Sequence, residues 1–299
     1  MRHEVFIIST FFVTTIASAQ KSDPYKPDLN VPPPIPGMVL KWNDEFNTSG
    51  QPDSSKWTYE RGFVRNEELQ WYQPQNATCK NGCLLIAGKR ERIRNPNYNS
   101  SSQRWQQNRE FAEYTAASLK TQGRWQFQYG RLEVRARVDT SMGSWPAIWT
   151  LGVSERWPLN GEVDIMEFYR VGNSPTILAN AAWGRSNSGG PVWNTKRIPL
   201  ANFLSKDRDW PKKFHVWRMD WTADSIKLYL DDELLNAQAL RQTLNPDGKN
   251  PFQQPHYLLL NLAIGANGGD PANTRFPISY EVDYVRFYQP VSSHAPHSN

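Results

Sequence analysis

The chain has 299 residues, of which 38% are hydrophobic and 21% charged, and a formal net charge of +5. Lys and Arg are scattered and no nucleic-acid-binding motif occurs, so the charge indicates solubility or attraction to an anionic polymer, and we expect no nucleic acid as a partner. The two cysteines and five histidines form no cluster with transition-metal spacing, which argues against a zinc-type site.

The N-terminus is typical of an exported protein. Residues 1–19 have the form of a signal peptide, in which Arg2 precedes an apolar stretch and small residues at 17–19 supply a cleavage site. The apolar stretch is too short to span a membrane, and no later segment is apolar for long enough. We therefore expect a protein that is secreted, periplasmic or exposed at the cell surface, with no membrane span.

One domain is expected beyond the signal peptide. Residues 20–37 hold many prolines and few apolar residues, which predicts an extended tether. Residues 38–290 form one compositional block without an internal repeat, and about 250 residues can form a single all-β domain. Residues 291–299 remain as a tail, and we expect the protein to be a monomer.

Short alternating or apolar runs separated by turn residues predict β-strands, and long amphipathic helices are absent from the pattern. The pattern indicates two packed antiparallel sheets. The runs lie at residues 84–87, 131–138, 146–151, 214–219, 226–230, 257–264 and 282–288.

Cys79 and Cys83 flank a tight turn. A three-residue turn with Gly82 in the left-handed conformation would place the two cysteines opposite each other, where a disulfide could form in an oxidising compartment. A two-residue turn of Asn81 and Gly82 would instead place them on opposite faces of the hairpin. The sequence leaves both arrangements open.

Two polar segments, residues 91–113 and 184–193, predict irregular structure, and the first has the composition of a long loop. Between them, Arg131, Arg135 and Arg137 alternate with apolar residues. Because successive side chains of a strand point to opposite faces, these arginines predict a solvated sheet face.

The most informative segment carries three acids within six residues, Glu162, Asp164 and Glu167. Their apolar neighbours predict a strand, in which Glu162 and Asp164 share one face while Glu167 would point into the core. An unpaired carboxylate is costly to bury, so we expect a β-bulge at residues 165–166 that returns Glu167 to the acidic face.

Such a bulge suits acid–base chemistry on a sugar. It sets the Cα atoms of Glu162 and Glu167 roughly 13 Å apart. Side chains that lean inward bring the carboxyl groups to roughly 6 Å, near the separation of retaining glycosidases. Repulsion among the acids raises at least one pKa, which yields a nucleophile and a proton donor from one residue type. The alternatives are a solvated acidic face or a calcium site, although calcium sites favour loops.

Thirteen tryptophans are many for this length. Trp145 and Trp149 share one face of the strand that precedes the acids, and flat indole rings suit the C–H faces of sugars. We expect this pair in a cleft. The alternative is that both rings fill the core of the sandwich.

Residues 161–168 resemble the active-site signature of glycoside hydrolase family 16, in the bulged form shared by laminarinases, agarases and carrageenases. Further segments resemble the same family in the same order, so that the match covers about residues 38–290. They lie at residues 42–46, 66–70, 129–135, 145–149, 220–222 and 282–286.

The resemblance implies a β-jelly-roll sandwich with a concave substrate cleft. It implies that Glu162 is the nucleophile, that Glu167 is the acid/base, and that Asp164 orients and tunes them. It implies no organic cofactor. It also implies that Asp283 helps to hold a structural calcium, with a simple salt bridge as the alternative.

Asn66 and Glu68 match polar residues that line the cleft in related enzymes, with a structural hydrogen bond as the alternative for each. Asn261 lies on the polar side of its strand and is a further substrate-binding candidate. The sequence departs from laminarinases at Trp183, where they often carry a histidine, and at residues 265–270, where they often carry a tryptophan. We expect Trp183 to be a third stacking platform.

These features predict an endo-acting, retaining β-glycanase that binds a polysaccharide with β-1,3 or mixed β-1,3/1,4 linkages. One alternative keeps the chemistry and changes the substrate to a galactan of the agar, porphyran or carrageenan type. Another is a transglycosylase, in which an acceptor sugar replaces water. A third is a secreted lectin on the same fold, although a lectin has no need of three acids on one bulged strand.

Overall fold

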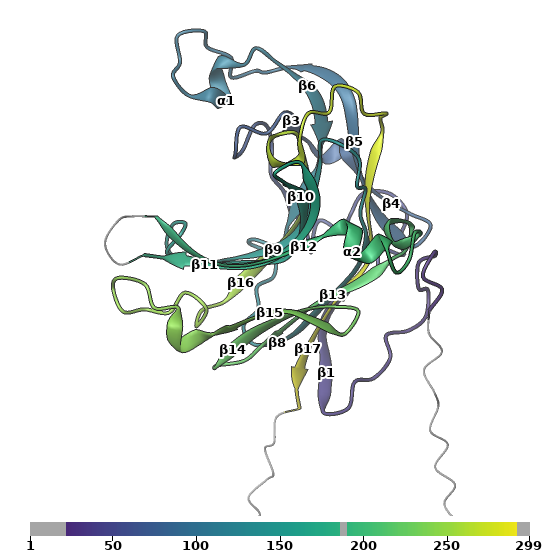
Figure 1. Ribbon diagram of the computed structural model, residues 1–299, viewed down its shortest axis with the longest axis vertical. Helices are drawn as coiled ribbons and strands as arrows, with labels where there is room; N and C mark the ends of the chain where they lie inside the picture. Colours follow the sequence, from purple (N-terminus) through teal and green to yellow (C-terminus); the bar gives the residue numbers. More distant parts are fainter. Residues whose placement is uncertain (1–21, 186–189, 292–299) are drawn as a thin grey trace, which may run out of the picture.

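Alternating apolar residues give each strand one face for a shared core, and the strands assemble into two sheets packed face to face (Figure 1). The computed structural model describes residues 22–185 and 190–291. The sheets have ten and seven strands, and apart from the parallel pair of β3 and β6 the pairing in these ranges is antiparallel. The prediction of an all-β, two-sheet sandwich is confirmed. The predicted signal peptide at 1–19 lies outside the described residues.

The ten-stranded sheet runs in the order β15-β14-β13-β8-β17-β5-β6-β3, with β1 paired to β17 and β4 to β5. The strands expected at residues 84–87, 131–138, 214–219, 226–230 and 282–288 fall within this sheet. Its strands are β1 Met38–Asp44, β3 Gln70–Tyr72, β4 Ala77–Lys80, β5 Cys83–Arg94, β6 Phe111–Ala116, β8 Gly130–Arg137, β13 His215–Trp221, β14 Ser225–Leu230, β15 Glu233–Ala239 and β17 Ile278–Pro290, while the expected run at 146–151 belongs to the other sheet.

The seven-stranded sheet runs in the order β12-β11-β10-β9-β16-β7-β2. Residues 184–193 were expected to be irregular, but β11 and β12 extend into this segment from its two ends. Residues 186–189 lie outside the described residues. Its strands are β2 Thr58–Tyr59, β7 Ser118–Lys120, β9 Ser144–Gly152, β10 Glu162–Val171, β11 Ser174–Gly184, β12 Pro191–Pro199 and β16 His256–Ile264.

Helices are short and connect the strands. No helix within the described ranges is long and apolar enough to cross a membrane. The short helices are α1 Trp105–Asn108, α2 Leu200–Leu204, η1 Pro74–Asn76, η2 Trp210–Lys212, η3 Leu240–Gln242 and η4 Ala266–Gly268.

The main hydrophobic core lies between the two sheets, and β16 shows how the sequence builds it. Leu258, Leu260 and Leu262 all lie in this core. The alternate residues of β16 face the other side of the seven-stranded sheet, where Leu259 packs in a second small cluster. This second face carries the cleft described below.

The hairpin of β4 and β5 resolves the arrangement of the cysteines. Lys80 pairs with Cys83, so the turn contains only Asn81 and Gly82. Their φ angles of 54° and 77° are those of a type I′ turn, which Asn-Gly favours. Cys79 and Cys83 therefore lie on opposite faces, and both are buried free thiols.

The polar segment at residues 91–113 is more regular than the expected loop, because β5 and β6 extend into it and pair with each other. The part between them folds back toward the cleft. The guanidinium of Arg109 donates hydrogen bonds of 2.7 and 3.1 Å to the backbone carbonyls of Glu68 and Glu67. This excursion is thus tied to the loop that borders the active-site cleft.

The prediction that Arg131, Arg135 and Arg137 form a solvated face is wrong for Arg135. This side chain is buried, and its Nη1 lies 2.5 Å from Oδ2 of the buried Asp283. The same guanidinium donates to the backbone carbonyl of Lys26 at 2.9 Å. Strand alternation correctly predicts that Arg135 faces away from the core between the sheets, but it cannot predict that another segment covers this outer face.

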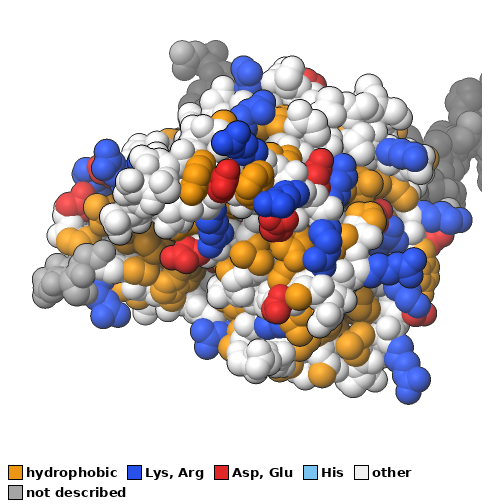
Figure 2. All heavy atoms as spheres, turned by 90° about the horizontal axis from the view of Figure 1, so that it is seen from above, with side chains coloured by type: hydrophobic (Ala, Val, Ile, Leu, Met, Phe, Trp, Pro, Cys, Tyr) orange, Lys and Arg blue, Asp and Glu red, His pale blue; other side chains and the backbone are white. Residues whose placement is uncertain are grey.

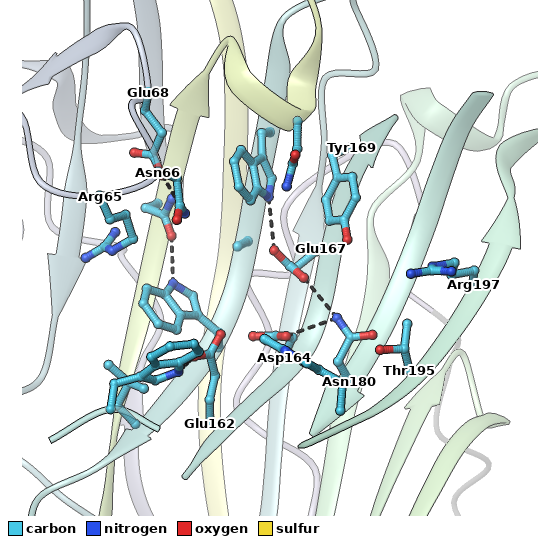
Figure 3. A pocket seen from close by; sticks show the side chains of 18 residues that line it. Arg65, Asn66, Glu68, Glu162, Asp164, Glu167, Tyr169, Asn180, Thr195 and Arg197 are labelled. Atoms are coloured by element: carbon cyan, nitrogen blue, oxygen red, sulfur yellow. Dashed lines mark hydrogen bonds between the residues drawn. The ribbon is translucent and has the colours of Figure 1, made fainter. Parts of the chain in front are cut away.

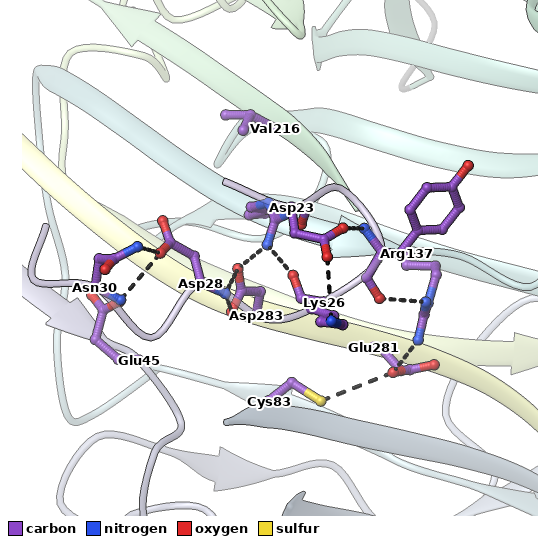
Figure 4. Close-up of polar contacts among 12 residues, drawn as sticks. Asp23, Lys26, Asp28, Asn30, Glu45, Cys83, Arg137, Val216, Glu281 and Asp283 are labelled. Atoms are coloured by element: carbon purple, nitrogen blue, oxygen red, sulfur yellow. Dashed lines mark hydrogen bonds and ion pairs between the residues drawn. The ribbon is translucent and has the colours of Figure 1, made fainter. Parts of the chain in front are cut away.

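The covering element is the N-terminal segment, whose described part begins at Ser22. Arg135 also donates to the carbonyl of Asp23, and the backbone N–H of Asp28 donates to both carboxylate oxygens of Asp283 (Figure 4). Residues 23–28, which belong to the tether expected at residues 20–37, are therefore bound to the ten-stranded sheet.

The substitution Asp283→Asn is expected to destabilise the fold by roughly 3–5 kcal/mol, because it leaves the guanidinium of Arg135 buried without a counter-charge. Denaturant titration measures the loss. Asp220→Asn is the matched control, because Asp220 pairs with Arg131 on the same sheet where both side chains are partly exposed; it should cost about 1 kcal/mol or less. Equal losses in the two variants would contradict the expectation.

Candidate active site

β10 contains the predicted bulge. On one side Asp164 pairs with Trp149 and Met166 with Ile148, so that Ile165 is the extra residue, and the register with β11 shifts over the same stretch. Ile165 and Met166 both lie in the core. Two consecutive apolar residues can be buried together only if the strand departs from strict alternation. The prediction for residues 165–166 is confirmed.

The bulge brings the three acids together in one cleft of about 660 Å³ on the outer face of the seven-stranded sheet (Figure 3). Side chains from β9, β10, β11, β12 and β16 line it, together with the loop before β3. The lining residues are Arg65, Asn66, Glu68, Trp145, Ala147, Trp149, Leu151, Trp157, Glu162, Asp164, Glu167, Tyr169, Asn180, Trp193, Thr195, Arg197, Asn261 and Asn267.

Glu167 is held by two donors. The indole N–H of Trp145 donates to Oε1 at 3.0 Å, and the side-chain amide of Asn180 donates to Oε2 at 2.9 Å. Burial raises the pKa of Glu167 to about 7, against the lowering effect of the Trp145 hydrogen bond. A carboxyl group with this pKa can give up and take back a proton near neutral pH.

Asp164 lies between the two glutamates and is buried. The amide of Asn180 donates to its Oδ2 at 3.0 Å. Burial, followed by the charges of Glu167 and Glu162, raises the pKa of Asp164 well above its usual range. The raised pKa favours the protonated form of Asp164, whose carboxyl group can then donate a hydrogen bond to a neighbouring carboxylate.

Glu162 begins β10 and is partly buried. Burial raises its pKa, whereas hydrogen bonds with Asp164 and Trp157 act in the opposite direction. The indole N–H of Trp157 donates to Oε2 at 2.5 Å. These hydrogen bonds favour the ionised form of Glu162 and oppose the effect of burial.

The stacking platforms differ in part from the prediction. Trp145 and Trp149 line the cleft as expected. Trp183 does not: it lies in the core between the sheets and packs edge-to-face against Phe252. Asn180 faces the cleft from the same strand, and a residue three positions further along has the opposite orientation. The expectation that Trp183 is a platform is therefore wrong.

Two other tryptophans line the cleft instead. Trp157 and Trp193 are 49% and 44% exposed, which is unusual for large aromatic side chains. Trp157 precedes β10 in a connecting loop, and Trp193 lies on the edge strand β12. Neither position follows a periodic sequence pattern that would predict its place in the cleft. The high number of tryptophans indicated only that some of them could line it. Asn180 was also missed as a partner of the acids.

The predicted polar residues lie in the cleft and are already engaged. Glu68 accepts hydrogen bonds from Gln70 at 2.7 Å and from Asn66 at 3.3 Å. Asn261 accepts one from the indole of Trp149 at 2.7 Å. The locations of Asn66, Glu68 and Asn261 agree with the prediction, and their hydrogen bonds show that each also supports the wall of the cleft.

The surroundings of Asp283 do not fit a calcium ion. Calcium takes six to eight oxygen ligands, whereas the nearest partner of Asp283 is the positively charged guanidinium of Arg135. Within residues 22–185 and 190–291 no group of three or more His, Cys, Asp or Glu side chains is placed to hold a metal. The alternative of a salt bridge describes this residue.

Comparison with known proteins places these features in context. A family model described as Glycosyl hydrolases family 16 matches residues 87–286. The chain is 32% identical to the beta-glucanase of Rhodothermus marinus, over 97% of this chain and 95% of that protein.

Two solved structures are also similar. One comes from work on endo-acting O-glycanases with which prominent members of the human gut microbiota initiate mucin breakdown; it is 36% identical, with a TM-score of 0.79, over 87% of this chain and 94% of that chain. The other is an endo-beta-1,3-glucanase from Pyrococcus furiosus, 30% identical, with a TM-score of 0.71, over 86% of this chain and 99% of that chain.

Proposed function

This chain belongs to glycoside hydrolase family 16 and is an O-glycosyl hydrolase, and from this premise we propose that it is a secreted, endo-acting, retaining β-glycanase that cleaves β-1,3- or mixed-linkage β-glucan. The glucanases of Rhodothermus marinus and Pyrococcus furiosus support the substrate class. An open cleft that crosses several strands suits attack within a chain. The signal-peptide pattern at 1–19 supports export.

The proposed reaction has two steps. Glu167 donates its proton to the glycosidic oxygen while the carboxylate of Glu162 attacks the anomeric carbon, so that the leaving chain departs as an alcohol and a glycosyl ester forms. Glu167, now ionised, takes a proton from water, whose oxygen attacks the anomeric carbon and releases Glu162. The mechanism uses the side chains of this protein and water, and a sugar hydroxyl in place of water gives transglycosylation.

One observation carries this proposal: the bulge places the carboxyl groups of Glu162 and Glu167 in the same cleft. Hydrogen bonds from Trp157 and Asp164 favour the anion of Glu162, and burial raises the pKa of Glu167 to about 7. A retaining glycosidase needs one carboxylate and one carboxylic acid at the start of its cycle.

A second candidate substrate is the O-glycan of mucin or another galactose-containing polymer. The similarity to the gut O-glycanase structure, at 36% identity and a TM-score of 0.79, favours it. So does the departure at Trp183, which stands where laminarinases often carry a histidine and packs in the core. The chemistry at Glu162 and Glu167 would be unchanged.

A panel of polysaccharides tests the substrate. Purified protein is incubated with laminarin, lichenan, agarose and mucin, and the products are sized by chromatography. Oligosaccharides from laminarin or lichenan support the glucanase, and oligosaccharides from mucin or agarose alone support the second candidate. Monosaccharides as the first product would contradict endo action, and an α-configured first product in an NMR time course would contradict retention.

The variant Trp157→Phe is expected to move the acidic limb of the kcat/KM profile to higher pH. Removal of the indole N–H takes away a hydrogen bond that lowers the pKa of Glu162, so the nucleophile is neutralised at higher pH than in the parent. We expect kcat/KM to fall roughly threefold or more near pH 5 and less near pH 7.

Trp193→Phe is the control for this variant. It changes an exposed tryptophan of the same cleft whose indole donates no hydrogen bond to the three acids among the described residues. We expect a change in KM without movement of the acidic limb. Equal pH profiles for the two variants would show that Trp157 does not tune Glu162.

A further inference from the structure

The edge strand β12 presents one row of side chains to the cleft, in register with the three acids. Across β10, β11 and β12, Glu162 aligns with Ala182 and then Trp193, and Asp164 aligns with Asn180 and then Thr195. In the third row Glu167 aligns with Leu178 and then Arg197. The three outer members, Trp193, Thr195 and Arg197, all line the cleft.

Each row of aligned residues runs across the strands, from an acid on β10 to a residue on β12. Two strand spacings separate β10 from β12, so the Cα atoms of Glu167 and Arg197 stand about 10 Å apart. A glycan that crosses the strands with its cleaved bond over β10 therefore places a neighbouring sugar over β12. Figure 3 shows Arg197 and Thr195 on the same side of the cleft as Asn180 and Tyr169.

Among the described residues, the basic side chains that line this cleft are Arg65 and Arg197. The two guanidinium groups differ in whether a carboxylate is paired with them. Arg65 forms an ion pair with Glu60 and lies 4.9 Å from the ring centroid of Trp149. Arg197 is exposed, and no carboxylate of the described residues lies within ion-pair distance of it. Its guanidinium therefore remains available to a ligand.

Two further observations bear on the ligand. Burial raises the pKa of the Tyr169 phenol, and the Arg197 charge acts in the opposite sense, so the guanidinium lies within electrostatic reach of the wall beside Glu167. The net charge of +5 favours approach of a polyanion, and Figure 2 shows Lys and Arg side chains spread across the face in view. The carboxylate of Glu162 alone would repel such a polymer from the cleft.

We propose that Trp193, Thr195 and Arg197 form a subsite that recognises an anionic substituent, a sulfate ester or a carboxylate, on the sugar next to the cleaved unit. The indole supports the sugar ring, and the planar guanidinium donates paired hydrogen bonds to two oxygens of the anion. The hydroxyl of Thr195 is an additional donor. This inference rests on the proposed function, since it places the subsite along the same glycan.

The test compares Arg197→Gln with Lys196→Gln. Lys196 is the adjacent residue, is exposed and loses the same charge, but it pairs with Ala179, whose side chain lies in the core, and so it faces away from the cleft. The substrates are laminarin, partially sulfated laminarin and partially carboxymethylated laminarin, with sulfated and desulfated mucin glycans as a second series. The quantity measured is the ratio of kcat/KM on the anionic glycan to that on its neutral partner.

Arg197→Gln should lower this ratio roughly tenfold, because a charge-assisted contact is lost only with the anionic glycan. Lys196→Gln should leave both activities unchanged, and Arg197→Lys should restore part of the ratio. Comparison of the losses on sulfated and on carboxymethylated laminarin identifies sulfate or carboxylate as the preferred group. Equal ratios for the parent and Arg197→Gln, or the same loss with Lys196→Gln, would overturn the subsite.

Affinity electrophoresis through gels that contain the same glycans requires no turnover and separates this result from failure of the proposed function. If the parent protein cleaves no glycan of the panel, the proposed function fails. Stronger retardation by anionic than by neutral glycan, lost in Arg197→Gln but kept in Lys196→Gln, would still support the subsite. Equal retardation of all three proteins would overturn it.

Discussion

Glu162→Gln is expected to lower kcat by at least about 10⁴-fold, because an amide cannot form the glycosyl ester that the two-step mechanism requires. The fold should persist, since glutamine has nearly the same shape as glutamate. Sugar release from the best substrate measures the activity, and thermal unfolding checks the structure.

Glu68→Gln provides a matched control for this loss. Glu68 lines the same cleft, but its carboxylate is occupied by Gln70 and Asn66 and it belongs to a loop rather than to β10. We expect a loss in kcat of less than about 10²-fold. A comparable loss of kcat in both variants would contradict the role of Glu162 as the nucleophile.

Azide rescue assigns the roles of the two glutamates. In Glu162→Gly, azide can enter the space of the missing nucleophile and attack directly, which gives a glycosyl azide of inverted configuration. In Glu167→Gly, azide attacks the glycosyl ester in place of activated water, which gives a product of retained configuration. NMR of the anomeric proton distinguishes the two. The reverse outcome would exchange the assignments.

Glu167→Gln is expected to lower kcat on a polysaccharide by about 10²–10⁴-fold and to remove the alkaline limb of the pH profile. Glu167 must be protonated for the first step, and burial raises its pKa to about 7, so kcat/KM of the parent should decline as the pH rises through about 7. Glu162 must be ionised, so the acidic limb should lie above the ordinary pKa of a glutamate.

An activated aryl glycoside separates acid catalysis from other effects of this change. Its leaving group departs without a proton, so the first step in Glu167→Gln should become nearly independent of pH above the acidic limb, and a burst of aryl alcohol should precede slow turnover. An unchanged alkaline limb in Glu167→Gln would show that another group supplies the proton.

The three acids could be assigned from the sequence because their spacing conflicts with a regular strand. Either Glu167 is buried without a partner or the backbone bulges, and the energy of burying a carboxylate decides between these alternatives. The core face of β16 was predictable for a related reason, since a period of two fixes which leucines share a side. These are local constraints, and neighbours in the chain suffice to satisfy them.

Other features depended on contacts between distant segments. Strand alternation identified Arg135 correctly as facing away from the core, yet the N-terminal segment, whose Lys26 is 109 positions away, covers it. Trp183 was assigned to the cleft by resemblance, and the register of β11 turns it into the core. Trp157 and Trp193 reach the cleft from a loop and an edge strand, where no periodicity marks them.

The sequence by itself determined the bulged cluster of three acids and the class of fold, because hydrophobic alternation and the burial of charge act between residues that are close along the chain. The tertiary structure alone decided which tryptophans and arginines border the substrate, because that depends on how strands pair across the sheet and on which segment packs over each face. Arg197 illustrates this division: its position opposite Glu167 exists only once β10, β11 and β12 are aligned.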